Sequence, residues 1–144
     1  MEEAKLELEY LIVGEAVDNA NGKLYVLGGG WSQIQSPVFP TIARCGIAVS
    51  VLAPTPVQPL GVKIHFSDAA KSMTLEMEGK VQAGAPRPGA KIPARQRIFV
   101  VLNGNFPIPK PGQYEITVSL PDGQSKTLSF EAMQIAQPTE PILN

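Results

Sequence analysis

The stretch Pro111–Met133, PGQYEITVSLPDGQSKTLSFEAM, decides the fold class because apolar and polar residues alternate on both sides of a turn signal. In its first half, Tyr114, Ile116, Val118 and Leu120 fall on one face and polar residues fall on the other. A period of two is typical of a β-strand with one buried and one wet face. The Pro-Asp-Gly sequence at 121–123 favours a tight turn, so the stretch predicts a β-hairpin.

The same alternation recurs along the chain, and no window without glycine or proline breaks has a helical period. The first strand places Leu6, Leu8, Tyr10 and Ile12 on one face and Glu7 and Glu9 on the other, until Leu11 and Val13 make both faces apolar. Asp18–Gly22 then favours a first hairpin, followed by apolar Leu24, Val26 and Leu27. The other predicted strands are Ile42–Leu52, Gly61–Phe66, Met73–Glu78, Arg97–Leu102, Tyr114–Leu120 and Thr127–Met133.

Proline-rich connections separate these strands, at 53–59, 85–89 and 107–112. About eight short, mostly antiparallel strands predict an all-β, single-domain β-sandwich of immunoglobulin-like appearance. In such sandwiches a tyrosine near a strand start can anchor a connection, which is one interpretation of Tyr114; a plain strand former is the other. We expect the domain to span 1–133 and 134–144 to be a mobile tail, or one that docks on a neighbour through Ile142 and Leu143.

Composition narrows the class of partner. The 144 residues fit one core, and only 17% are charged against about 25% in ordinary domains. With 12 basic and 13 acidic residues the net charge is −1, which provides no field for nucleic acid. No apolar run approaches the length of a membrane span, and the acidic start is unlike a leader, so we predict a cytoplasmic protein without membrane contact.

The glycine triplet Gly28–Gly30 lacks the lysine and spacing of a phosphate-binding loop and opens no helix, so we interpret it as a bend in a strand. Just beyond it, Trp31 has two interpretations: a lid on the core, which we favour, or a platform on which a ligand stacks while Ser32 and Gln33 donate hydrogen bonds. Glu15 is either an exposed acid beside the first hairpin, which is favoured, or a buried carboxylate of a ligand site.

Four basic residues, Arg87, Lys91, Arg95 and Arg97, form a local run without an acid between Gln82 and Phe106. They could contact an anionic partner, although a solvated loop is the simpler interpretation. His65 is expected to point outward from its strand, and Cys45 to pack as a small apolar side chain. One histidine and one cysteine leave a zinc site short of ligands, so we predict no metal, no cofactor and no catalytic set.

Short motifs spread over most of the chain resemble a small bacterial family of uncharacterised domains. The motifs are Glu7-x-x-Tyr-Leu-Ile-Val-x-Glu15, Gly22-Lys-Leu-x-x-Leu-Gly28, the Phe39-Pro40 pair and Pro111-Gly-x-Tyr114. The resemblance implies one compact unit and transfers no catalytic residue.

Three functional classes follow, in order of preference. The first is a non-enzymatic interaction or assembly domain that contacts itself or another protein. The second is a small-ligand or carbohydrate-binding module centred on Trp31, and the third is an enzyme of unrecognised type that uses Glu15 or His65.

Overall fold

The computed structural model describes residues 6–54, 59–71, 73–81 and 95–136, which contain strands and no helix. The strands are β1 (Glu7–Gly14), β2 (Ala16–Ala20), β3 (Lys23–Leu27), β4 (Gln33–Ser36), β5 (Thr41–Pro54), β6 (Leu60–Asp68), β7 (Thr74–Val81), β8 (Arg95–Ile108), β9 (Gly112–Ser119) and β10 (Ser125–Gln134). These ten strands exceed the predicted eight because a separate β2 and the short polar β4 were not expected. The predicted tail lies almost entirely outside the described residues.

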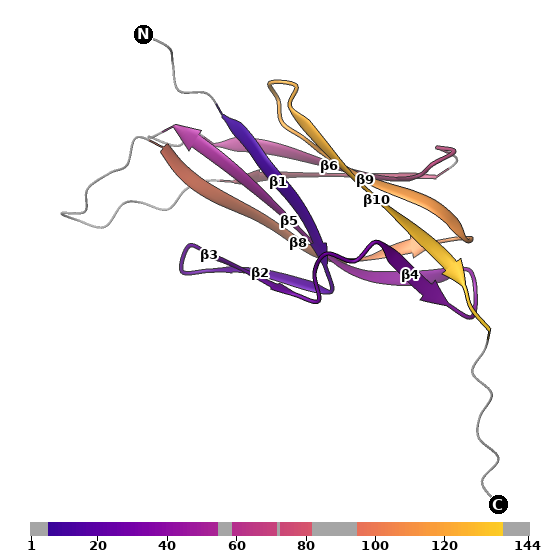
Figure 1. Cartoon of the computed structure of the whole chain (residues 1–144). Helices are drawn as coiled ribbons and strands as arrows, with labels where there is room; N and C mark the ends of the chain where they lie inside the picture. The colour runs from indigo at the N-terminus through magenta and orange to yellow at the C-terminus, as the bar shows by residue number, and fades with distance from the viewer. Residues whose placement is uncertain (1–5, 55–58, 72, 82–94, 137–144) are drawn as a thin grey trace, which may run out of the picture.

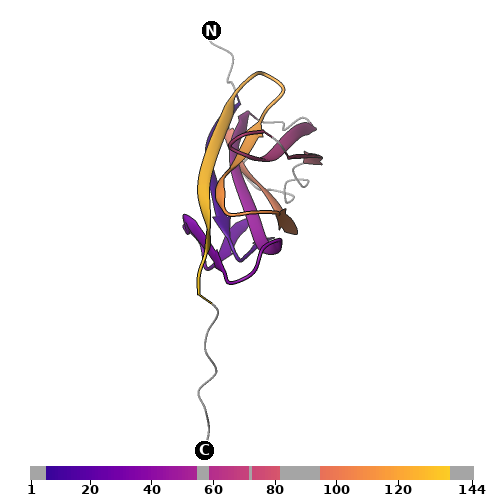
Figure 2. The ribbon, with the colours of Figure 1, turned by 90° about the vertical axis from the view of Figure 1, so that its right-hand side faces the viewer.

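Two sheets pack face to face, so the predicted β-sandwich is confirmed (Figure 1). One sheet has the order β1-β5-β8 and the other β4-β10-β9-β6-β7, while β2 and β3 form a separate hairpin. Neighbouring strands are antiparallel except β4, which runs parallel to β10. Figure 2 shows β10 extending along the length of the domain.

The core lies between the inner faces of the two sheets. Every second residue of β5 from Cys45 to Val51 is buried against Ile116 and Val118 of β9. Three rings, Phe66, Tyr114 and Phe130, stack in this layer with centroids 5.6 to 6.1 Å apart. Cys45 is buried in the same core as expected, and burial raises its pKa to about 12.

A β-bulge corrects the predicted faces of the first strand. The register shifts between Leu8 and Tyr10, so Glu9 is an extra residue on β1. Leu8 and Leu11 therefore both point into the core, whereas Tyr10 and Ile12 lie half-buried on the opposite face. Strict alternation from Leu6 to Ile12 was wrong because an inserted residue inverts every face beyond it.

Strand β8 is longer than predicted. It continues past Leu102 to Ile108, with Pro107 opposite Ile42. Proline is tolerated there because β8 is at the edge of its sheet in the order β1-β5-β8, and an edge residue can leave its outer side without a hydrogen bond. The predicted connection at 107–112 is thus shorter.

Tyr114 anchors that connection. It is 1% exposed, and its hydroxyl donates a 2.6 Å hydrogen bond to the carbonyl of Lys110. The anchoring interpretation of Tyr114 is therefore confirmed.

The glycine triplet bends the chain, but it lies in the connection between β3 and β4 and not within a strand as predicted. Gly28 and Gly30 have φ values of 59° and 81°, which L-residues with side chains rarely adopt. The N–H of Gly30 donates to the carbonyl of Val13 at 2.9 Å, which turns the chain from β3 across the end of β1. The chain then joins the opposite sheet as β4.

Candidate functional site

The candidate site lies where β1 ends before its neighbour does. β1 pairs with Gly46–Leu52 of β5, whereas β8 pairs with the whole of β5 from Thr41 to Pro54. Among the described residues, Thr41–Cys45 thus has a strand neighbour on one side only. The strand position beside this segment is open.

A hollow of about 340 Å³ occupies this position, and we call it the edge groove. One wall is the start of β5, and the other is β4 together with Trp31, which lies two residues before it. Glu15, directly after β1, also lines the groove. Its lining residues are Glu15, Trp31, Gln33, Ile34, Gln35, Ile42, Ala43 and Arg44.

The structure brings together the three residues predicted for ligand binding, because Glu15, Trp31 and Gln33 all line the edge groove. The glycine bend places Trp31 and Gln33 opposite β5, and Glu15 follows directly after β1. Trp31 is half-buried and meets Phe130 edge-on, with ring centroids 5.4 Å apart. Its ring is both a lid on the core and a wall of the groove.

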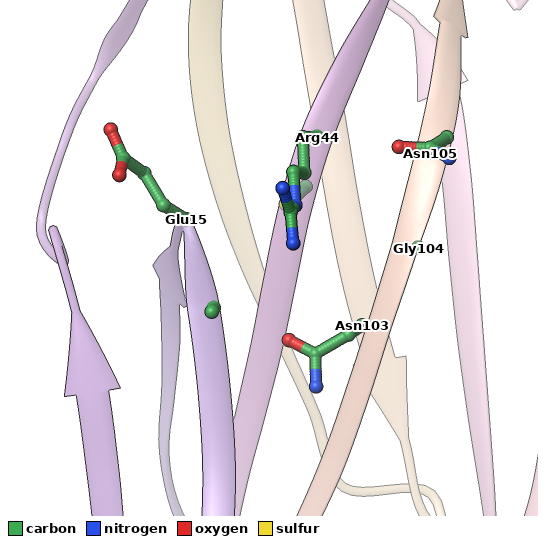
Figure 3. A pocket seen from close by; sticks show the side chains of 7 residues that line it. Glu15, Arg44, Asn103, Gly104 and Asn105 are labelled. Atoms are coloured by element: carbon green, nitrogen blue, oxygen red, sulfur yellow. The ribbon is translucent and has the colours of Figure 1, made fainter.

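A second hollow of about 490 Å³, which we call the amide hollow, adjoins the edge groove and shares Glu15 and Arg44 with it. Figure 3 shows Arg44 and Asn105 on the neighbouring strands β5 and β8, with Glu15 across the hollow. Its lining residues are Glu15, Ala16, Arg44, Cys45, Asn103, Gly104 and Asn105.

Arg44, Asn103 and Asn105 line the amide hollow but were not predicted from the sequence. The sequence separates Arg44 from the two asparagines by about sixty positions, and only the antiparallel pairing of β5 with β8 makes them neighbours. The one local signal, Asn103-Gly-Asn105, has the composition of a turn although it lies within a strand.

Asn103 has a structural task in this hollow. Its amide accepts from the N–H of Val17 and donates to the carbonyl of Val17, both at 2.8 Å, as a neighbouring strand would. These two bonds hold the β2–β3 hairpin against the outer face of β8. Asn105 makes no such bond among the described residues, so its amide is available to a ligand.

Two residues of the predicted basic run are paired with acids of β1. Arg97 binds Glu9 at 2.6 Å and Arg95 binds Glu7 at 3.3 Å. Hydrogen bonds from Arg97 and from Ser50 lower the pKa of Glu9 from 4.5 to about 2. Arg87 and Lys91 lie outside the described residues, and anion contact by the run stays a prediction.

The remaining candidates are not near the edge groove. His65 is on the outer face of β6, opposite Glu76 of β7 and Thr117 of β9, and points outward as predicted. A third hollow of about 330 Å³ lies on this face around Lys63 and Glu78. Within the described residues there is neither a cluster of three metal-ligating side chains nor a helix able to cross a membrane.

Fold and site together define a small all-β sandwich domain with an open groove at one strand edge. Residues 9–133 match the model of a family described as "Family of unknown function (DUF6941)", and the chain belongs to that family. The predicted membership of an uncharacterised family is confirmed. No curated protein matches the chain.

Proposed function

We propose that this protein is a non-enzymatic interaction domain that holds another protein chain in the edge groove. The observation that carries the proposal is the one-sided pairing of Thr41–Cys45. A strand edge with free N–H and C=O groups is a template for pairing with another chain, and many peptide-binding domains use it so.

The surroundings of this edge support a protein partner. Ile42 is 68% exposed at the groove, and Trp31 and Ile34 provide further apolar wall. An exposed apolar side chain beside an unpaired strand edge is a feature that isolated domains ordinarily avoid, because it promotes association. A bound chain would cover Ile42 and at the same time pair with the strand edge at Thr41–Cys45.

A second candidate function is the binding of a small ligand such as a carbohydrate. It is favoured by the meeting of Trp31, Gln33 and Glu15 in one hollow, whose volume of about 340 Å³ lies within the range of ligand pockets. Flat polar side chains beside an aromatic ring suit a sugar, which offers hydroxyls and an apolar face.

The two functions are separated by Ile42→Asp. We expect a library of short peptides to yield sequences that bind the full chain, and Ile42→Asp to abolish that binding by placing a charge on the apolar wall. Leu75→Asp is the matched control, since Leu75 is a 37% exposed apolar residue on β7. Peptide binding that survives Ile42→Asp would refute the proposal, and glycan binding lost in Trp31→Ala would favour the second function.

We also propose that the sandwich is of immunoglobulin type. The order β1-β5-β8 opposite β10-β9-β6-β7 supports this, as does the Tyr114 hydroxyl bonded to Lys110 before the strand that contains it. Self-association, a bacterial source and a cytoplasmic location stay predictions.

A further inference from the structure

The unpaired segment Thr41–Cys45 limits what the edge groove can hold. Five extended residues span about 16 Å, so the occupant that pairs with them is a strand of four to six residues. Such a strand would occupy the position that β1 vacates at Gly14, directly in line with it. Its side chains would alternate between Trp31 on the core side and Arg44 on the outer side.

Arg44 is the cation at the mouth of the groove. It is exposed, and the ion pairs of the described residues join other side chains, Lys63–Glu76, Lys71–Glu115, Arg95–Glu7 and Arg97–Glu9. Its guanidinium therefore has its donors available for a partner.

Asn105 flanks Arg44 on the side away from the added strand. Arg44 and Asn105 are direct partners in the register of β5 with β8, so their side chains leave the sheet on the same face about 5 Å apart. Asn105 is two strand spacings, or about 10 Å, from the added strand, so the contact with the occupant falls to Arg44. The guanidinium fork of Arg44 matches the two oxygens of a carboxylate.

Glu15 does not neutralise this site. No ion pair joins it to Arg44, and Figure 3 shows its carboxylate turned away from the guanidinium. Glu15 sits on the opposite wall of the amide hollow, where it would repel a second acid. The charge pattern thus selects an acidic side chain at one position of the occupant.

We propose that the edge groove accepts an extended protein segment that adds as a strand along Thr41–Cys45 and places an aspartate or glutamate side chain against the guanidinium of Arg44. This inference rests on the proposed function, since it names the kind of chain that the interaction domain binds. In an extended strand, a residue two positions from the acid lies on the same face as the acid. That residue meets Ile42 while the acid meets Arg44 only if the strand runs alongside β5. A fixed spacing of two between an acid and an apolar residue therefore indicates that the peptide binds as an added strand.

The test uses the full chain and a library of eight-residue peptides, acetylated and amidated so that no terminal charge contributes. We expect selected peptides to carry Asp or Glu at a fixed distance from an apolar residue. Arg44→Ala should weaken their binding about tenfold or more, the usual effect of losing a charged hydrogen-bonding partner. Arg44→Glu should reverse the preference to Lys or Arg.

Two controls sharpen the result. Lys126→Ala removes the same charge from an exposed position on β10 and should leave Kd unchanged. Methylating alternate backbone nitrogens of a selected peptide should abolish binding for one set and spare the other, because a strand added at an edge uses every second residue.

The outcomes distinguish the two proposals. Peptides that need Ile42 but show no acid preference, or that tolerate both methylation sets equally, would overturn this inference and leave the proposed function standing. A library without any peptide that depends on Ile42 would overturn both. Acid-selective binding that Arg44→Glu inverts would establish the inference.

Discussion

The side chain of Asn103 makes the two backbone hydrogen bonds that a neighbouring strand would make. Its amide bonds both backbone groups of Val17, a residue only 4% exposed, so removing it leaves a donor and an acceptor without partners. We expect Asn103→Ala to lower the free energy of unfolding by about 1–3 kcal/mol, the cost of buried unsatisfied groups. Urea denaturation measures this.

Asn105→Ala is the control for Asn103→Ala, because it removes the same amide two residues further along β8. We expect it to change the unfolding free energy by less than about 0.5 kcal/mol, as exposed substitutions usually do. Equal effects of the two substitutions would show that Asn103 is not a clamp.

Glu9 should make stability depend on pH in the acid range. Its folded-state pKa of about 2 lies below the ordinary 4.5, so its stabilisation is complete above pH 4.5 and is lost as pH falls toward 2. Because Arg97 is half-exposed, solvent screening holds the contribution to about 1 kcal/mol or less.

Urea denaturation at pH 6 and pH 2 tests this. Glu9→Gln should be less stable than the unchanged protein at pH 6, and the difference should be several-fold smaller at pH 2. Glu7→Gln removes a neighbouring acid whose pair with Arg95 is exposed on both sides, and should have little effect. A stability difference for Glu9→Gln that is as large at pH 2 as at pH 6 would contradict the prediction.

At the scale of the elements, the β2–β3 hairpin packs on the three-stranded sheet at Gly46 of β5, where only glycine leaves enough room. A Cβ on Gly46 would stand 2.8 Å from the N of Val17 and 2.8 Å from Oδ1 of Asn103. We expect Gly46→Ala to push β2 away from β5 and to lower the melting temperature by several degrees, since a change of 1 kcal/mol shifts Tm by about 2–8 °C at this size.

Gly104→Ala provides the comparison for Gly46→Ala. It lies on β8 in the same sheet, and a Cβ there has nothing within 4 Å. We expect Tm to stay the same or to rise slightly, because alanine restricts the unfolded chain. A fall as large as that of Gly46→Ala would mean that contact with the hairpin is not the cause.

Local patterns predicted the elements whose signals are local. The Asn21-Gly22 turn has positive φ at both residues, and the glycine bend lies where the triplet predicted it. The bulge at Glu9 was not predicted, because Glu7 and Glu9 fit a plain alternation of polar and apolar residues equally well. β4 also escaped, since its four residues Gln-Ile-Gln-Ser become a strand only through pairing with β10.

The same limit applies to the candidate site. Trp31 was chosen because it is the single tryptophan, Gln33 because it is near Trp31, and Glu15 because it lies among apolar residues. The structure places all three in one groove. Arg44 and Asn105 have no individual signal. Their meaning comes from the register of β5 with β8 and from the early end of β1, which are long-range properties of the sheet.

At the scale of the whole molecule, the outer faces of the two sheets differ. The outer face of the five-stranded sheet is polar, with Lys63 paired to Glu76 and Thr117 bonded to Thr127. Tyr10 and Ile12 make the outer face of the three-stranded sheet more apolar, and the β2–β3 hairpin lies against this face. The edge groove opens beside that hairpin, so association is expected on the three-stranded side.

An unoccupied edge groove should therefore cause weak association of the free protein. Two copies could pair along Thr41–Cys45, because identical edges can meet antiparallel about a two-fold axis. We expect light scattering to give an average mass that rises above 15.4 kDa with concentration. Ile42→Lys should restore the monomer by placing a charge on the edge, whereas Leu75→Lys on β7 should not. A mass of one chain at every concentration would reject self-pairing. The open edge beside β5 would then have to be filled by a strand from a different protein, since every copy of this chain carries the same edge.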